Sequence, residues 1–194
     1  MISALLLAAG SSRRFGAPKL LQTLNSRPVV RWSAEALAGV ADELVVVTPP
    51  DDAQLRKALD GLAARFVVNP RATDGMAGSL ACGVASVAAN VDAVLVALGD
   101  EPLLPRRCHE RIVARYREGG AGVVAATYGG VRGHPVLFSR AVFPELLGLT
   151  GDNGARSVAD RDPARLVLVE MNEEHPVDVD TPEDLARVAR RTQV

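Results

Sequence analysis

The amino-acid sequence predicts an α/β protein in which helices cover both faces of a mostly parallel sheet. Short apolar runs alternate along the chain with segments whose apolar residues recur at helical spacing. The apolar runs are continuous, as is typical of parallel strands that are buried on both faces. The chain has 194 residues, of which 48% are hydrophobic, and this is enough for one domain with a large core.

The expected elements follow one another in order up to residue 117. Strands are expected at residues 2–8, 43–48, 65–69 and 92–98, and helices at residues 28–38, after Asp51 or Asp52, at residues 77–88 and at residues 105–117. Parallel sheets bind ligands at the carboxyl ends of their strands. The polar turns that follow the strands are therefore the first candidates for a functional site.

Beyond residue 120 the pattern is looser. A cluster of glycines surrounds two apolar runs at residues 123–128 and 135–138, and we expect these runs to form a small glycine-rich hairpin added to the core. A strand at residues 166–170 follows. A short strand that begins near residue 175 and leads into a helix completes the expected elements.

The composition argues against several classes of protein. The net charge is −1, so there is no basic excess of the kind that nucleic-acid binding requires. Cys82 and Cys108 are the only cysteines and lie far apart, which indicates buried, reduced thiols in a cytoplasmic protein. Residues 2–9 are too few to span a membrane, and basic residues follow them instead of preceding them as in a signal peptide. We expect neither nucleic acid nor a membrane as a partner.

Charge is distributed unevenly along the chain. Residues 1–34 contain five Arg or Lys residues and no acid, whereas residues 166–186 contain seven acids and no Arg or Lys. The two segments could meet around a polyanion and a metal ion. They could also be two solvated faces, which is the simpler interpretation of charge alone.

The first expected strand ends in a turn with the sequence GSSRRFG, residues 10–16. Backbone N–H groups in such a turn can bind phosphate oxygens, and Arg13, Arg14 and Lys19 would add charge-assisted contacts. The spacing matches neither a Walker A loop nor the GxGxxG dinucleotide motif. The pattern indicates an anion-binding turn, with a tight turn that bears solvated arginines as the alternative.

Three aspartates are candidates for a metal site. Asp100 follows a buried strand, where the alternative is a turn or cap aspartate. Asp178 and Asp180 are separated by one residue, so their carboxylates would face the same side of an extended segment. Thr181 to Asp184 have the pattern of a capped helix start. A carboxylate 4 Å from a phosphate oxygen is repelled by roughly 4 kcal/mol, so carboxylates beside a triphosphate indicate Mg²⁺ between the two charges.

Three further loops carry one candidate residue each. GMAGSL contains Ser79, which could contact a ribose or base, or could simply begin a helix. GHPVLF contains His134, and a lone loop histidine is expected to face solvent. GDNGAR contains Arg156, which could hold a phosphate or cap a helix.

The motifs together resemble a known family. LAAGSSRRFGAPK at residues 7–19 resembles the LAAGxSxRxGxxK signature of nucleotidyltransferases. With GMAGSL, LGDEPL, RGHPVLF, GDNGAR and VDVDTPEDL in this order, the chain is similar over nearly its whole length to molybdenum cofactor cytidylyltransferases and their close homologues. The resemblance implies a Rossmann-like three-layer α/β/α fold as one domain over residues 1–194. It also implies an NTP-binding part at about residues 1–104 and an acceptor-binding part at about residues 105–194.

The resemblance further implies a reaction and its participants. CMP would pass from CTP to molybdopterin, the organic part of molybdenum cofactor, with release of pyrophosphate and without a covalent intermediate. Mg²⁺, or Mn²⁺ in its place, would be the cofactor. A molybdenum hydroxylase apoenzyme is a further partner that the resemblance suggests.

Roles are implied for the residues that match the family motifs. The catalytic residues would be Lys19, Arg13 and Asp100, and the metal ligands would be Asp100 and Asp180. The nucleotide would contact Leu7, Ala8, Ala9, Gly10, Ser12, Arg13, Lys19, Gly75 and Ser79. The acceptor would contact Arg132, Gly133, His134, Pro135 and Arg156.

The choice of nucleotide depends on one position. The cytidylyl branch of the family reads like Ala8-Ala9-Gly10, whereas the guanylyl branch usually reads LAGG, so Ala9 favours CTP over GTP. The alternatives are a GTP-using molybdopterin guanylyltransferase, an enzyme for a sugar or polyol phosphate, and a chaperone that binds molybdenum cofactor without turnover.

Overall fold

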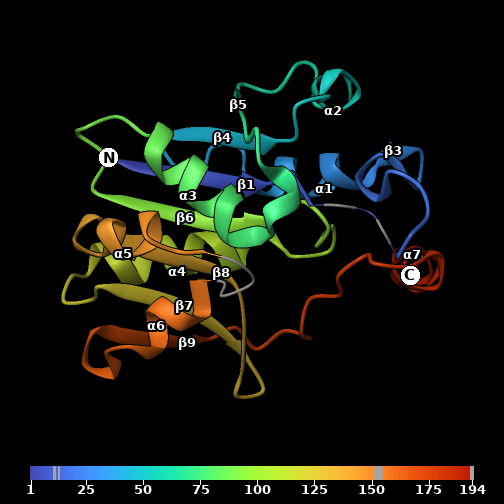
Figure 1. The fold of residues 1–194 in the computed structure, drawn as a ribbon. Helices are drawn as coiled ribbons and strands as arrows, with labels where there is room; N and C mark the ends of the chain where they lie inside the picture. Colours follow the sequence, from blue (N-terminus) through green and yellow to red (C-terminus); the bar gives the residue numbers. More distant parts are fainter. Residues whose placement is uncertain (11, 13, 151–154, 193–194) are drawn as a thin grey trace.

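A seven-stranded sheet runs through the part of the chain that the computed structural model describes, which is residues 1–10, 12, 14–150 and 155–192. In spatial order its strands are β5 (Arg65–Val68), β4 (Glu43–Thr48), β1 (Ile2–Leu7), β6 (Ala93–Leu98), β8 (Val131–Ser139), β7 (Val123–Tyr128) and β9 (Leu166–Glu170). Within this sheet β8 is antiparallel to both of its neighbours, and the other adjacent pairs are parallel (Figure 1). A separate small hairpin consists of β2 (Thr23–Leu24) and β3 (Arg27–Pro28).

Helices pack on both faces of the sheet. One face is covered by α1 (Val29–Leu37), α2 (Ala53–Ala58) and α4 (Arg106–Arg117). The other face is covered by α3 (Met76–Ser86), α5 (Phe143–Leu147) and α6 (Ala155–Asp160). The last helix, α7 (Pro182–Arg191), contacts β2. The predicted three-layer Rossmann-like α/β/α fold is confirmed.

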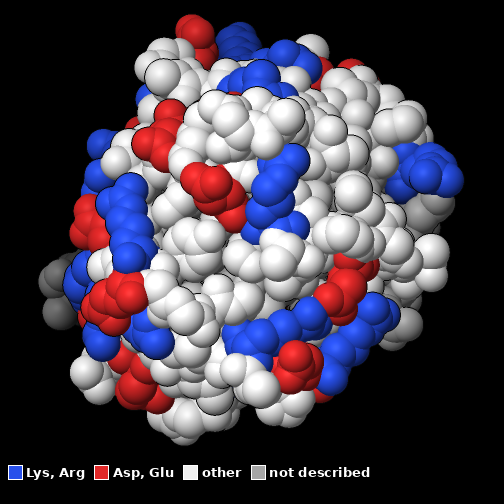
Figure 2. Space-filling model, turned by 90° about the vertical axis from the view of Figure 1, so that its left-hand side faces the viewer, with Lys and Arg blue, Asp and Glu red and all other residues white. Residues whose placement is uncertain are grey.

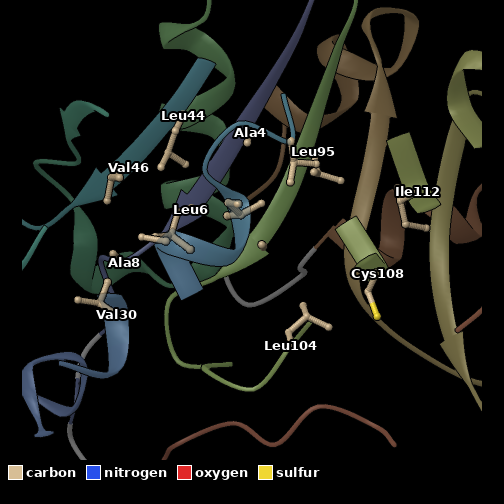
Figure 3. Close-up of a cluster of buried hydrophobic side chains, with 14 of the residues drawn as sticks. Ala4, Leu6, Ala8, Val30, Leu44, Val46, Leu95, Leu104, Cys108 and Ile112 are labelled. Carbon is tan, nitrogen blue, oxygen red and sulfur yellow. The ribbon is translucent and has the colours of Figure 1, made fainter. Parts of the chain in front are cut away.

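The sheet divides the core into two apolar clusters because successive side chains of a strand point to opposite faces. In β1, Ala4 and Leu6 belong to the cluster beneath α1 and α4, which Figure 3 shows in close-up. Leu5 and Leu7 belong to the cluster beneath α3 and α5. Every residue of β1 is buried, which explains why the strand is a continuous apolar run in the sequence.

The glycine-rich hairpin differs from its predicted role. It is not an addition to the core, because β8 pairs with β6 along the edge that the parallel strands would otherwise leave open. Residues of β7 are buried throughout, since β7 lies between β8 and β9 inside the sheet. The strand β8 is also longer than predicted and begins at Val131.

The segment between β9 and α7 also differs from the prediction. The short strand expected from residue 175 is absent from this described stretch, which instead crosses the carboxyl ends of the strands as an extended strap (residues 172–181). The backbone N–H of Val179 donates to the carbonyl of Asp100 at 2.9 Å, and Val179 is fully buried. The predicted helix start is confirmed, because Thr181 and Asp184 form a reciprocal capping box.

The two cysteines are placed differently. Cys108 is buried as predicted, but Cys82 is only half-buried, and its thiol lies 3.6 Å from the carbonyl oxygen of Val68. Among the described helices, none combines the length and the hydropathy that crossing a membrane requires.

Figure 2 shows the face of the molecule at the amino ends of the parallel strands. Basic and acidic side chains are interspersed on this face, with uncharged surface between them. The basic segment (residues 1–34) and the acidic segment (residues 166–186) meet instead at the opposite, carboxyl end of the sheet.

A buried histidine in α4 makes stability depend on pH. His109 is 1% exposed, and burial lowers its pKa from 6.5 to about 4. Between these values the unfolded chain binds a proton that the folded protein excludes, so stability is complete above about pH 6.5 and declines as the pH falls towards 4. We expect a loss on the order of 3 kcal/mol at pH 4 from this residue alone.

Urea unfolding of the native protein and of His109→Phe, at pH 7 and pH 4, measures that loss. The variant should have the smaller decrease in the free energy of unfolding between the two pH values. Equal decreases would show that His109 is not the buried neutral group described here.

Candidate active site

The site lies where the carboxyl ends of β1 and β6 meet the strap. Lys19 follows the turn after β1, and its ammonium Nζ lies 2.5 Å from Asp100 Oδ2 and 2.6 Å from Asp180 Oδ1. Asp100 lies in the turn directly after β6, and Asp180 lies in the strap. Arg14 Nη2 lies 2.8 Å from the second oxygen of Asp180. The basic first segment and the acidic last segment therefore meet, and the interpretation as two solvated faces is wrong at this point.

The three charges at the centre strongly affect one another. Burial alone would lower the pKa of Lys19, but Asp100 and Asp180 raise it above its usual value, so the ammonium stays charged. Burial raises the pKa of Asp100, and Lys19 opposes that rise. Burial and repulsion from Glu101 and Asp100 raise the pKa of Asp178 to about 6.

Hydrogen bonds hold the turn after β1 in place. The hydroxyl of Ser12 accepts a hydrogen bond from the backbone N–H of Lys19 at 3.0 Å. The backbone N–H of Gly99 donates to the carbonyl of Leu7 at 3.0 Å. A Cβ at Gly99 would lie 3.2 Å from that carbonyl oxygen, so glycine allows the two turns to approach closely. Arg13 and residues 151–154 of the GDNGAR loop lie outside the described residues.

A first cavity, of about 390 Å³, surrounds the Lys19–Asp100–Asp180 cluster. Most of the residues predicted to contact a nucleotide line it, together with Arg14 and Asp178. The predicted lining residues are Leu7, Ala9, Gly10, Lys19, Gly75, Ser79, Asp100 and Asp180.

Two of the predicted nucleotide contacts lie elsewhere. Ala8 and Ser12 line a neighbouring cavity of about 500 Å³, together with Gly10 and residues of the turn after β4. Neighbouring side chains of the β1 turn point in opposite directions, so Ala8 and Ala9 face different cavities.

A second cavity, of about 380 Å³, adjoins the first. Leu7, Met76, Leu98 and Asp178 line both cavities. The predicted acceptor residues in the second cavity are Arg132, Gly133, His134 and Arg156, whereas Pro135 is buried and does not line it. Most of the remaining wall is apolar, and consists of Leu80, Val96, Ala125, Val131, Val136, Ala155 and Ala159.

The walls of the second cavity are tied to the sheet. Arg132 Nη2 lies 2.5 Å from Asp160, and Arg156 Nη2 donates to the carbonyl of Arg132 at 3.2 Å. Gly133 packs closely, since a Cβ there would lie 3.1 Å from the Tyr128 ring and 3.2 Å from His175.

His134 differs from its prediction, and Glu101 was not predicted as a site residue. His134 is in β8 and not in a loop, and its side chain is only 23% exposed. Its Nδ1 lies 3.3 Å from Oε1 of Glu101, whose side chain is 3% exposed. The sequence did carry a signal, because two adjacent acids at the end of a buried strand point to different sides.

Two carboxylates form a suitable place for a divalent cation. One oxygen of Asp100 and one of Asp180 lie within 2.6 Å of the same ammonium nitrogen, so the two carboxylates are close enough together to bind one cation jointly. Across residues 1–10, 12, 14–150 and 155–192, no group of three or more His, Cys, Asp or Glu side chains is arranged to hold a metal ion. Mg²⁺ is commonly held by one or two carboxylates together with substrate phosphates, and the donor set fits that mode of binding.

Comparisons with known proteins agree with this geometry. A family model described as the MobA-like NTP transferase domain matches residues 4–166. The molybdenum cofactor guanylyltransferase of Cereibacter sphaeroides is 31% identical over 189 residues, which cover 94% of this chain and 93% of that protein. The purine catabolism protein PucB of Bacillus subtilis (strain 168) is 29% identical over an alignment of 199 residues. This alignment covers 95% of this chain and 94% of that protein.

Similarity extends to solved structures. Rv0371c from Mycobacterium tuberculosis H37Rv, crystallised in complex with manganese, has a TM-score of 0.78 and 29% sequence identity to this chain. The match covers 97% of this chain and 98% of that one.

Proposed function

The chain belongs to the family of MobA-like NTP transferase domains and is a nucleotidyltransferase, and we propose that it transfers CMP from CTP to molybdopterin. Pyrophosphate would be the second product. The observation that carries this proposal is the position of the Lys19–Asp100–Asp180 cluster beside two adjoining cavities, because such a transfer must bring two phosphate-bearing substrates together at one point.

We assign the first cavity to the nucleotide. Lys19, Arg14 and the backbone of the β1 turn would neutralise and hold the triphosphate, with Arg13 as a further contact from the sequence resemblance. Gly75 and Ser79 would lie beside the sugar and base. The NTP-binding part is then about residues 1–104, completed by Asp180 from the strap.

We assign the second cavity to the acceptor. Residues 105–194 supply most of its polar lining residues, and residues 1–104 supply Leu7, Met76, Leu80, Val96, Leu98 and Glu101. Its apolar wall suits a planar heteroaromatic ring such as a pterin better than a sugar, whose hydroxyl groups would each lose hydrogen bonds against it. Arg132, His134 and Arg156 supply the polar contacts. Gly133 would form part of this wall with its backbone, and the buried Pro135 would support it from behind.

The base would be cytosine. Ala9 lines the first cavity and is 3% exposed, so its methyl group occupies space that glycine would leave for a larger purine. The similarity to a guanylyltransferase supports nucleotidyl transfer, and our proposal of CTP depends on Ala9.

Positioning and charge neutralisation would carry the mechanism, as in other phosphoryl-type transfers. The acceptor phosphate would attack the α-phosphorus in line, and Lys19 would stabilise the charge that develops on the α-phosphate. Asp100 and Asp180 would hold Mg²⁺ or Mn²⁺, which supplies neutralisation of the phosphate oxygens when bound. A phosphate monoester is already anionic near pH 7, so no general base is required.

Pyrophosphate release in the presence of Mg²⁺ tests this proposal. Each of CTP, GTP, ATP and UTP is supplied with and without molybdopterin or its molybdenum form. We expect release with CTP that depends on molybdopterin. The Ala9→Gly variant should gain activity with GTP relative to CTP, since the substitution enlarges the wall beside the base.

The other outcomes separate the alternatives. Release with GTP in the native protein would make the chain a guanylyltransferase and overturn the role of Ala9. Release that depends on a sugar or polyol phosphate would replace the acceptor. Binding of molybdopterin without turnover would indicate a chaperone that delivers the cofactor to a partner such as a molybdenum hydroxylase apoenzyme in the cytoplasm.

A further inference from the structure

Glu101 is a buried carboxylate that the proposed reaction does not use. It follows Asp100 in the turn after β6, and its side chain is 3% exposed. Its Oε1 lies 3.3 Å from His134 Nδ1, while its Oε2 has no hydrogen-bond partner in the part of the chain that the structure describes. A buried carboxylate with an unpartnered oxygen is unfavourable for folding, so the core alone does not account for it.

His134 is held in a fixed position from two sides. Glu101 contacts one ring nitrogen, and the hydroxyl of Tyr128 donates to the backbone carbonyl of His134 at 2.5 Å. The residue also belongs to β8 and follows Gly133, against which Tyr128 and His175 pack. The contact at Nδ1 leaves Nε2 as the ring nitrogen that can reach a ligand in the second cavity.

The surroundings of His134 favour its charged form. Burial alone would lower the pKa of His134, but the carboxylates of Glu101, Asp178 and Asp100 together raise it. These acids reach it from two elements, the turn after β6 and the strap. A histidine held by a carboxylate on one nitrogen is oriented, and more basic, at the other.

We propose that Glu101 is a positioning residue that holds the His134 imidazole so that Nε2 binds the phosphate monoester of the acceptor. This assignment rests on the proposed function, because it places the phosphate of the acceptor at the end of the second cavity nearest Asp100. His134 would contact the phosphate, and Glu101 would act only through His134.

The position of the Glu101–His134 pair agrees with a role in binding the acceptor phosphate. Asp178 lines both cavities, and the Glu101 that contacts His134 directly follows the proposed metal ligand Asp100 in the chain. A phosphate bound by His134 therefore lies on the side of the acceptor cavity that faces the metal ligands. Arg132 and Arg156 are left to contact the rest of the acceptor.

The binding of phenyl phosphate, an aromatic phosphate monoester, tests the site without turnover. The chain contains only three histidines, so their ring signals in a nuclear magnetic resonance spectrum are assigned by substituting each one. We expect phenyl phosphate, and not phenol, to shift the His134 signal. Glu101→Gln should weaken this binding at least fivefold, and His134→Gln should weaken it to the same degree.

Matched variants separate positioning from a general structural effect. Glu43→Gln makes the same chemical change at the amino end of β4, away from both cavities, and should leave the affinity unchanged. The double variant Glu101→Gln/His134→Gln should bind no more weakly than His134→Gln alone, because Glu101 acts through His134.

Kinetics with molybdopterin provide the second readout. The KM for molybdopterin should rise at least fivefold in Glu101→Gln, while the KM for CTP stays within twofold. Unchanged affinity for phenyl phosphate in folded Glu101→Gln, or a shift of the His175 signal alone, would overturn the inference. Phosphate binding at His134 in a protein that releases no pyrophosphate with any acceptor would overturn the proposed function and retain the phosphate site.

Discussion

Replacing Lys19 by methionine is expected to lower the rate of pyrophosphate release by about 10³-fold. The ammonium of Lys19 is the positive charge that Asp100 and Asp180 share, and the side chain is only 9% exposed. Methionine retains the length and much of the volume of lysine but cannot stabilise negative charge at the α-phosphate. The loss should appear in kcat more than in the KM for CTP, because the interaction strengthens as charge develops.

The chain offers a matched control. Lys57 is the only other lysine; it is exposed on α2 and lines none of the three cavities described above. Lys57→Met should retain native activity. Circular dichroism and thermal unfolding should show that Lys19→Met remains folded. Near-normal turnover in folded Lys19→Met would rule out the role proposed for this residue.

Removing either proposed metal ligand is expected to have the second large effect. We expect Asp100→Asn or Asp180→Asn to lower activity by about 10²–10³-fold at millimolar Mg²⁺ and to raise the metal concentration needed for half-maximal activity. Each substitution replaces a charged ligand by a neutral amide and leaves the shape of the side chain unchanged. Chelation of the metal should abolish activity in the native protein, and Mg²⁺ or Mn²⁺ should restore it.

Asp178→Asn is the informative comparison, since Asp178 lies two residues from Asp180 in the same strap. The backbone amide of the intervening residue bonds to Asp100, but Asp178 itself has no contact with Lys19 among the described pairs. Its substitution should cost less than tenfold. A larger loss in Asp178→Asn than in Asp180→Asn would show that Asp178, and not Asp180, is the metal ligand.

The sequence predicted the parallel half of the sheet and the meeting of its turns because both depend on local pattern. Continuous apolar runs identify strands buried on both faces, and the carboxyl ends of such strands share one edge of the sheet. Lys19 and Asp100 follow two of these runs, so their proximity could be anticipated. The capping box at Thr181 and Asp184 was likewise readable, since it depends on residues only three positions apart.

The rest depended on contacts that sequence spacing does not encode. The antiparallel pairing of β8 with β6 joins residues 40 or more positions apart, as in Val94 and Phe138, and nothing local fixes that choice. The strap is not a strand because it crosses the carboxyl ends of the strands, and so it does not lie along an edge strand with which it could pair. The Glu101–His134 contact went unpredicted for the same reason, since it depends on where β8 pairs.

The position of the strap near the end of the chain also determines when, during synthesis, both proposed metal ligands are present. Lys19 and Asp180 are separated by 161 residues, and synthesis proceeds at about 5–20 residues per second. A nascent chain therefore carries Lys19 for on the order of 10–30 s before Asp180 emerges. Of the two carboxylates that contact this ammonium in the folded protein, Asp100 precedes the strap and Asp180 lies in it. A ribosome that stalls after β9 therefore leaves a sheet whose proposed metal site has one of its two carboxylates.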